Sequence, residues 1–423
     1  MKSPARLREP WRGGANLLFP AFEPVPNQFT RLLCRSLWQA PAVVETPRRR
    51  YNRMKTFASA ILLLLLPSVS GCRQQVAVRA ANPTAVWITG FYGAVNGAEP
   101  ISEIPWGKIT HVDHFAAAPG VDVRGDGNGT VELHYLTDPE IKQIVAAAHR
   151  AGKKAIVTIK DNDHDPSAFS QSTSPGLIAI FVANIASFVN RNGYDGVDFD
   201  WETNVNVAQY EDLLGRVRTA FGSTKLILTE MGNWSGLEQV AASSYPSIDQ
   251  INLMCYDMDG PANGYSWYND ALFQAGNSSL MTCDWRVRAF TTAGVPAGKI
   301  GIGIPFYGRR WAGVTQALVN GTFTAGSTVF YRNLASDKAR WQPQYQFYDA
   351  VHKSDYLSIP LLHEFDSYNG VQSIKDVVAW QKSEGFGGFM TFTLEYEYLS
   401  FRAGDARYPL SVTLCQEVFG RCP

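Results

Sequence analysis

The sequence predicts an α/β protein built as a (β/α)8 TIM barrel with a small insertion between strands 7 and 8. Short apolar runs rich in β-branched residues alternate with helical patterns through most of the chain, which is typical of a parallel sheet. Eight such runs occur, the number that closes a barrel of this kind. Polar side chains follow the carboxyl ends of several runs, where such barrels place their active sites.

The expected strands follow one another at spacings that leave room for one helix and its loops. They are Val86–Phe91, Thr110–Phe115, Lys154–Ile159, Gly196–Trp201, Lys225–Glu230, Gln250–Tyr256, Ile300–Phe306 and Gly388–Thr393. The interval before the last strand is the exception, because about 80 residues are too many for a single crossover. An aromatic-rich stretch at about 312–362 indicates a small inserted domain there. An ordinary long surface loop is the alternative.

The helix after the second strand has the clearest limits. Thr137 and Glu140 have the spacing of a capping box, with Pro139 early in the first turn. Gly152 is suited to end the helix. The buried stripe between these limits is Ile141, Ile144, Val145 and Ala148. The segment 175–193 repeats the scheme and ends at Gly193.

Length and composition agree with one large enzyme domain. The chain has 423 residues, of which 45% are hydrophobic and 12% aromatic. Lys plus Arg and Asp plus Glu both number 38, so the formal net charge is zero. No basic field is present to attract nucleic acid or anionic lipid, and we expect neither as a partner. An aromatic-rich neutral protein suits a neutral polysaccharide.

The N-terminal part has the features of an export signal. Residues 1–53 are basic and irregular, whereas Met54 and Lys55 are followed by the apolar run 60–66. That run is too short to span a bilayer and suits the apolar region of a signal peptide. The small residues 69–71 before Cys72 resemble a bacterial lipobox, whose cysteine receives lipid.

These features divide the chain. We expect 1–53 to be a mis-called extension, 54–72 a lipoprotein-type signal peptide and 73–83 a short linker. The catalytic barrel would cover 84–410 and a C-terminal tail 411–423. The alternative is a long signal region with ordinary cleavage. In either case we expect an exported protein, lipid-anchored to the cell envelope or secreted, that meets the membrane only through a lipid anchor.

The cysteines follow from this division. Cys34 lies in the extension and Cys72 is the lipidation candidate. The remaining four are Cys255, Cys283, Cys415 and Cys422, an even number in an oxidising compartment. We expect Cys415 and Cys422 to form a disulfide in the tail. Cys255 either pairs with Cys283 or remains a buried thiol. No C-x-x-C pair suggests zinc, and we expect no metal and no cofactor.

The most informative segment is 194–202, which places Asp198, Asp200 and Glu202 at alternate positions. Val197, Phe199 and Trp201 lie between them, so the pattern is that of a strand with three acids on one side, roughly 6–7 Å apart. Like charges at that spacing repel. A fold tolerates them when at least one acid is held protonated, as a general acid must be. A solvated acidic edge strand and a hard-cation site are the alternatives.

The segment 195–202 resembles the DGxDxDxE signature of the family 18 glycoside hydrolases, the chitinases and their relatives. Segment 249–257, with M-x-Y-D at its end, resembles the sixth strand of that family. Segments 301–309 and 387–390 resemble its seventh and eighth strands. The resemblance runs from about Val86 to about Tyr398. It also implies that the insertion is a small α+β unit that walls one side of the cleft.

The resemblance implies a substrate-assisted mechanism, in which the N-acetyl oxygen of the sugar attacks the anomeric carbon. Glu202 would protonate the leaving oxygen and later deprotonate water. Asp200 would hold the acetamido N–H, and Asp198 would share a proton with Asp200. Tyr256 would donate a hydrogen bond to the acetamido oxygen, and Asp257 would position the sugar. Asp195 is expected to be a structural turn residue.

Further residues are expected to bind the sugar, and three positions depart from the family pattern. The additional binding candidates are Phe91, Trp234, Met254, Arg309 and Phe392. Segment 157–162 replaces the usual S-x-G-G and brings Lys160 near the mouth of the cleft. Phe392 stands where the family usually has a tryptophan under the scissile sugar. Glu230 stands where a small residue is more common, and would contact substrate or pair with Lys160 or Arg309.

The function expected from the resemblance is hydrolysis of β-1,4 linkages in N-acetylglucosamine polymers, either chitin or chitooligosaccharides. An endo-β-N-acetylglucosaminidase acting on N-glycan cores is one alternative. A non-catalytic, lectin-like chitin-binding protein is the other, although such relatives usually lack an acid at the position of Glu202. The expected partner is a saccharide that contains N-acetylglucosamine, bound by a monomer.

The lipidation hypothesis predicts the effect of one substitution. In a protein starting at Met54, Cys72→Ala removes the only thiol of the lipobox-like segment. We expect the variant to move from the membrane fraction to the soluble fraction and to lose incorporation of labelled fatty acid. Identical fractionation of the variant and its parent would instead indicate simple secretion.

Overall fold

Eight parallel strands close into a barrel, as the sequence predicts. In barrel order they are β1 (Trp87–Tyr92), β2 (His111–Val121), β4 (Lys154–Lys160), β5 (Gly196–Asp200), β6 (Leu226–Met231), β7 (Gln250–Leu253), β8 (Ile300–Pro305) and β14 (Gly388–Phe392). Strand β1 pairs with both β2 and β14, which closes the barrel. A further strand, β3 (Gly127–Glu132), pairs antiparallel with the end of β2.

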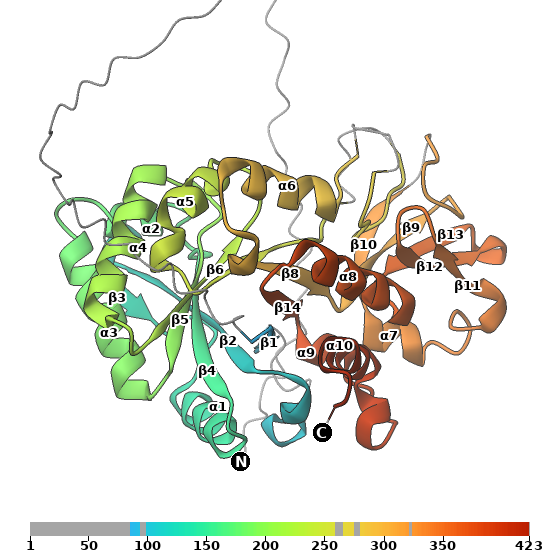
Figure 1. The fold of residues 1–423 in the computed structure, drawn as a ribbon, viewed down its shortest axis with the longest axis horizontal. Coiled ribbons are helices and arrows are strands. Elements are labelled where there is room, and N and C mark those ends of the chain that lie inside the picture. Colours follow the sequence, from blue (N-terminus) through green and yellow to red (C-terminus); the bar gives the residue numbers. More distant parts are fainter. Residues whose placement is uncertain (1–84, 94–98, 259–264, 275–279, 321–323, 423) are drawn as a thin grey trace, which may run out of the picture. The chain divides into compact units, whose positions relative to one another are not determined.

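The computed structural model describes residues 85–93, 99–258, 265–274, 280–320 and 324–422 (Figure 1). The expected extension 1–53, the signal segment 54–72 with Cys72, and the linker 73–83 lie outside the described residues. Among the residues that are described, no helix has the length and apolar character needed to cross a membrane.

Helices cover the outside of the barrel (Figure 1). They are α1 (Asp138–Arg150), α2 (Ala168–Ser172), α3 (Ile178–Asn192), α4 (Val207–Phe221), α5 (Leu237–Ser244), α6 (Cys283–Ala293), α8 (Val371–Glu384), α9 (Leu394–Glu397) and α10 (Pro409–Phe419). The expected limits of α1 are confirmed, because the Glu140 N–H donates to Thr137 Oγ1 at 3.4 Å. Helix α3 ends at Gly193, whose φ of 77° is left-handed and costs glycine little.

The insertion forms a second sheet between β8 and β14. Its strands are β9 (Tyr307–Ala312), β10 (Thr324–Phe330), β11 (Gln346–Asp349), β12 (Ser354–Ile359) and β13 (Glu364–Tyr368), and the order is β10-β9-β13-β12-β11 with antiparallel pairing throughout. Helix α7 (Tyr331–Ser336) follows β10. The alternative of a plain surface loop is therefore wrong. The sheet also extends past both ends of the expected 312–362, because β9 starts almost directly after β8 and β13 leads into α8.

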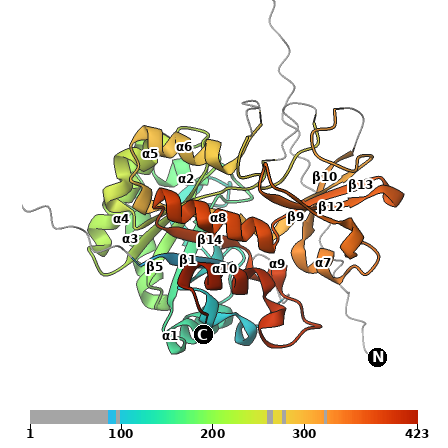
Figure 2. The same ribbon diagram turned by 45° about the vertical axis from the view of Figure 1, so that its right-hand side comes forward.

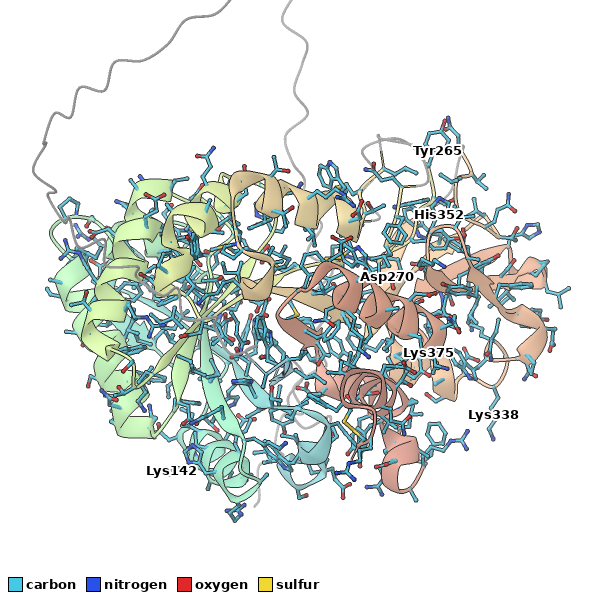
Figure 3. All side chains as sticks on the ribbon, viewed as in Figure 1. Lys142, Tyr265, Asp270, Lys338, His352 and Lys375 are labelled. Atoms are coloured by element: carbon cyan, nitrogen blue, oxygen red, sulfur yellow. A yellow bond between two sulfur atoms is a disulfide. The ribbon has the colours of Figure 1, made fainter. Side chains whose placement is uncertain are left out.

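The second sheet lies beside the barrel, as the two views in Figures 1 and 2 agree. The loop after β7 contributes to the junction. Ser354 Oγ on β12 donates to Asp270 Oδ1 at 3.0 Å, and the Leu272 N–H donates to the carbonyl oxygen of His352 at 2.8 Å. Asp270 and His352 are both labelled in Figure 3. The insertion is thus fixed to the end of the barrel from which the loop after β7 emerges.

The described part of the chain contains two disulfides. Cys415 and Cys422 join the end of α10 to the tail, and Cys255 joins Cys283. Of the two alternatives for Cys255, pairing is therefore correct and the free buried thiol is wrong. The Cys255–Cys283 disulfide connects the residue just before Tyr256 to the first residue of α6, so it holds this helix against the end of β7.

The two faces of β5 explain why its acids point into the barrel. Val197, Phe199 and Trp201 face the helices and are fully buried. The indole of Trp201 stacks on Phe169 of α2, with ring centroids 5.0 Å apart. Burying side chains of this size is worth about 1.5–3 kcal/mol each, which fixes the register of the strand. Asp198 and Asp200, at the alternate positions, must then face the interior.

Candidate active site

A cavity of about 440 Å³ opens at the carboxyl ends of the barrel strands. Its lining combines acids, two cations and an apolar floor. The lining residues are Phe91, Phe115, Lys160, Asp200, Glu202, Glu230, Trp234, Met254, Tyr256, Asp257, Met281, Arg286, Tyr307 and Phe392. A larger hollow of about 650 Å³ lies against α1 near Lys142 (Figure 3), but no carboxyl, thiol or imidazole group lines it. Of the two cavities, the smaller one is therefore the one lined by carboxyl groups that could take part in catalysis.

The three acids of the β5 pattern are stacked from the interior toward this cavity. Asp198 is completely buried, Asp200 is 8% exposed, and Glu202 is partly buried just beyond the strand. Asp200 and Glu202 line the cavity, whereas Asp198 lies beneath it. The carboxyls of Asp200 and Glu202 lie close enough to interact: burial raises the pKa of Asp200, and Glu202 raises it further. A proton can therefore be held between the two groups.

Burial is the main cause of the unusual proton affinity of these acids. It raises the pKa of Asp198 well above the ordinary value, and the nearby carboxyls of Asp113 and Asp200 raise it further. The pKa of Asp200 is likewise raised, first by burial and then by Glu202. Burial, followed by the charges of Asp161 and Asp257, raises the pKa of Glu202 to about 7. Glu202 thus holds its proton up to about neutral pH, as a general acid requires.

Asp161 fixes the backbone that carries Glu202. Its Oδ2 accepts from the Glu202 N–H at 3.0 Å, from the Thr203 N–H at 2.8 Å and from Thr203 Oγ1 at 2.8 Å. Asp161 lies in the segment that replaces S-x-G-G, directly after β4. Its neighbour Lys160 does line the cavity, as expected, and pairs with Asp163 at 2.5 Å. The altered segment therefore supports Glu202 from its own side of the barrel.

Tyr256 and Asp257 enter the cavity just after β7. The Tyr256 hydroxyl donates to Met390 Sδ at 3.8 Å, and Gly303 on β8 leaves space for its ring, since a Cβ there would lie 3.0 Å from Tyr256 Cε1. Asp257 accepts from Arg309 Nη2 at 2.6 Å. Arg309 is not among the cavity-lining residues, so it contributes to the site through Asp257.

Arg286 is the functional residue that the sequence did not indicate. It projects from the first turn of α6, is 4% exposed, and its guanidinium donates to the carbonyl oxygens of Met254 and Tyr256. It also lies over the Trp234 ring, 5.0 Å from the centroid, which is a cation–π geometry. Arg286 therefore holds the end of β7 and one aromatic wall together. A single arginine in a helix carries no signal in the sequence.

Aromatic rings form the floor of the cavity. Phe91, Phe115 and Phe392 lie with centroids 5.4–6.1 Å apart, and Phe392 lies 6.2 Å from Tyr256. Phe392 is therefore at the expected place. Phe115, Met281 and Tyr307 also line the cavity, although the sequence did not single them out. Phe115 ends the second expected strand and Tyr307 lies two residues before Arg309, so their strand positions could have indicated them.

The structure gives no support to a hard-cation site. Within the described ranges, no three His, Cys, Asp or Glu side chains are arranged to hold a metal ion.

Asp195 does not reach the cavity lining; its carboxylate accepts from the Ala155 N–H at 2.9 Å and pairs with Lys154 at 3.1 Å. It has the structural role expected of it.

Comparison with known proteins gives consistent results. The sequence profile of glycosyl hydrolases family 18 matches residues 88–397. Chitinase 1 of Aphanocladium album is 26% identical over 342 residues, which cover 72% of this chain and 79% of that protein. Chitinase A1 of Niallia circulans is 30% identical over 259 residues, but the match covers only 36% of that longer protein and 51% of this chain.

The fold is also similar to solved structures. The Group IV chitinase of Ostrinia furnacalis, in complex with allosamidin, aligns with a TM-score of 0.68 at 19% identity, over 79% of this chain and 99% of that one. At this identity the likeness concerns the fold, and it extends over the whole barrel.

The buried acids predict a dependence of stability on pH. Burial raises the pKa of Asp113 to about 7, so between its unfolded pKa near 4 and that value the folded state alone keeps the proton. Stability should therefore fall as pH rises from about 4 to about 7. Asp113 Oδ1 accepts a hydrogen bond from Thr158 Oγ1 at 2.8 Å, and the amide oxygen in Asp113→Asn can do the same. In this variant, the fall in the free energy of unfolding between about pH 5 and 7 should be smaller by about 1–3 kcal/mol. Urea unfolding at several pH values measures this, and an equal fall in both proteins would contradict it.

Proposed function

The chain belongs to glycosyl hydrolases family 18, and we propose that it hydrolyses β-1,4 linkages in chitin or chitooligosaccharides by a substrate-assisted, retaining mechanism. The proposal rests on the position and the raised pKa of the Glu202 carboxyl. This carboxyl lines the cavity together with that of Asp200, and burial raises the pKa of Glu202 to about 7. The two sequence relatives reported above are both named chitinases, which supports the choice of substrate.

In the first step Glu202 donates its proton to the glycosidic oxygen that leaves. The carbonyl oxygen of the acetamido group attacks the anomeric carbon, so one C–O bond forms as the other breaks and an oxazolinium ion results. Water then opens this ion, and Glu202 takes the proton from the water, which restores the acid. No carboxylate of the protein has to bond to the sugar.

Asp200 and Tyr256 would hold the attacking group in place. Asp200 accepts a hydrogen bond from the acetamido N–H, while the Tyr256 hydroxyl donates to the acetamido oxygen. The raised pKa of Asp198 and Asp200 means that these two acids retain protons between them, which helps Glu202 to keep its own. The ring of Phe392, between Phe91 and Tyr256, offers an apolar face under the sugar.

A lectin-like binding protein is the less supported alternative. A binding protein has no need of a carboxyl with a raised pKa on a backbone that Asp161 fixes, whereas a hydrolase does. Cleavage within N-glycan cores would use the same chemistry, and competition assays with a high-mannose glycopeptide and chitin oligomers would distinguish these substrates. We also propose that the protein is exported and acts outside the cytoplasm as a monomer.

Replacement of the acid tests its role. Glu202→Gln keeps the shape of the side chain and removes the donor proton, so we expect turnover of chitin oligomers to fall about 10²–10⁴-fold. In the parent protein, kcat/KM should decline as pH rises through about 7, because Glu202 then ionises. Circular dichroism provides the control for folding. Near-normal turnover by a folded Glu202→Gln protein would exclude this residue as the acid.

The nucleophile can be tested with the substrate. If the acetamido group attacks, fully deacetylated oligomers should not be cleaved, while acetylated oligomers are cleaved with retention at the anomeric carbon. A thiazoline mimic of the bicyclic intermediate should bind far more tightly than substrate. Tyr256→Phe should weaken that binding by about 1–3 kcal/mol, because a hydrogen bond to a charged group is lost. Efficient cleavage of deacetylated oligomers would show that a carboxylate of the protein attacks, and Asp200 would be the first candidate.

A further inference from the structure

Glu230 occupies a position that the proposed mechanism does not use. In the barrel β6 lies between β5 and β7. Asp200 ends β5, Tyr256 follows β7, and Glu230 is the next-to-last residue of β6. All three side chains line the same cavity. Glu230 therefore lies between the two groups that would hold the 2-acetamido group of the sugar.

The carboxyl of Glu230 makes no hydrogen bond of normal geometry within the described part of the chain, although Asn252 on β7 lies close enough to favour its charged form. The Glu230 side chain is 2% exposed. The two expected pairings are wrong: Lys160 pairs with Asp163, and Arg309 pairs with Asp257. Such a group normally costs about 1–3 kcal/mol when it stays unpaired. An unpaired polar group that lines a cavity is suited to bind a polar group of a ligand.

The protonation state of Glu230 determines what it can recognise. Burial raises its pKa well above the ordinary value, and the carboxyls of Asp198 and Asp200 raise it further. Asn252 on β7 opposes this by favouring the charged form, but it is the smaller effect. Burial therefore favours the protonated form of Glu230, which has one O–H donor and a free acceptor oxygen. A ligand hydroxyl matches this pair of groups, whereas a methyl group matches neither.

We propose that Glu230 selects the acyl group on the 2-amino nitrogen of the sugar, and that it favours an acyl group with a hydroxyl, such as N-glycolyl, over a purely apolar one. This inference rests on the proposed function. When the amide N–H donates to Asp200 and the amide oxygen accepts from Tyr256, the remaining substituent of the acyl carbon faces β6, the strand between them. The hydroxyl of a hydroxymethyl group there would accept a hydrogen bond from the O–H of protonated Glu230 and donate one to its second oxygen.

Selectivity between matched substrates tests the proposal. N-glycolyl and N-propionyl groups have nearly the same size and differ in a terminal hydroxyl or methyl. With chitobiose aryl glycosides that carry one or the other, we expect the parent protein to show a kcat/KM about 2- to 10-fold higher for the N-glycolyl substrate, the effect of one neutral hydrogen bond. Glu230→Gln keeps a donor and an acceptor and should retain the preference. Glu230→Leu should abolish or reverse it.

A surface control and a binding measurement complete the test. Glu384→Ala changes an exposed acid on α8 and should leave the ratio as in the parent. Calorimetry with the same sugars and the Glu202→Gln protein measures the preference without turnover, so loss of the proposed hydrolase activity would be seen separately from loss of selectivity. A ratio of one or less in the parent protein, or an unchanged ratio in folded Glu230→Leu, would overturn the role of Glu230.

Discussion

The burial of several carboxyl groups without a neutralising cation is the constraint on which this site depends. Asp113, Asp198 and Glu230 are almost inaccessible to water inside the barrel, and no Lys or Arg in the described ranges is seen to pair with them. Ionising all of them at once would be prohibitively costly in a low dielectric. Burial therefore favours the protonated forms of these groups. Asp198 lies beneath the cavity that Asp200, Glu202 and Glu230 line.

The surrounding fold holds these carboxyl groups where water cannot solvate them. The apolar face of β5 fixes the inward direction of its acids through Trp201 and Phe169. On the other side, Arg286 and the Cys255–Cys283 disulfide hold the end of β7, which carries Tyr256. Two independent supports, one apolar and one polar, thus orient Glu202 and Tyr256, the residues proposed to act as the acid and to contact the acetamido group. This preorganisation is what electrostatic catalysis requires.

The sequence allowed much of the barrel to be predicted, because strand patterns and capping residues are local signals. The expected ends of β4 and β5 agree with the structure to within one residue, and the capped start of α1 agrees as well. Motif positions also placed Glu202 and Tyr256 at the cavity. Arg286 and the supporting role of Asp161 could not be predicted, since they depend on contacts between distant segments. The limits of the insertion were missed because β9 continues almost without interruption from β8.

The state of the protons is the most direct test of this account. Neutron diffraction from a deuterated crystal near pH 6 would locate them on the carboxyl groups of the barrel. The account predicts deuterium on Glu202, on Glu230 and on at least one of Asp198 and Asp200. Ionised carboxylates at all four positions, balanced by ordered cations, would contradict it, because Glu202 would then have no proton to donate and Glu230 no donor to offer a ligand.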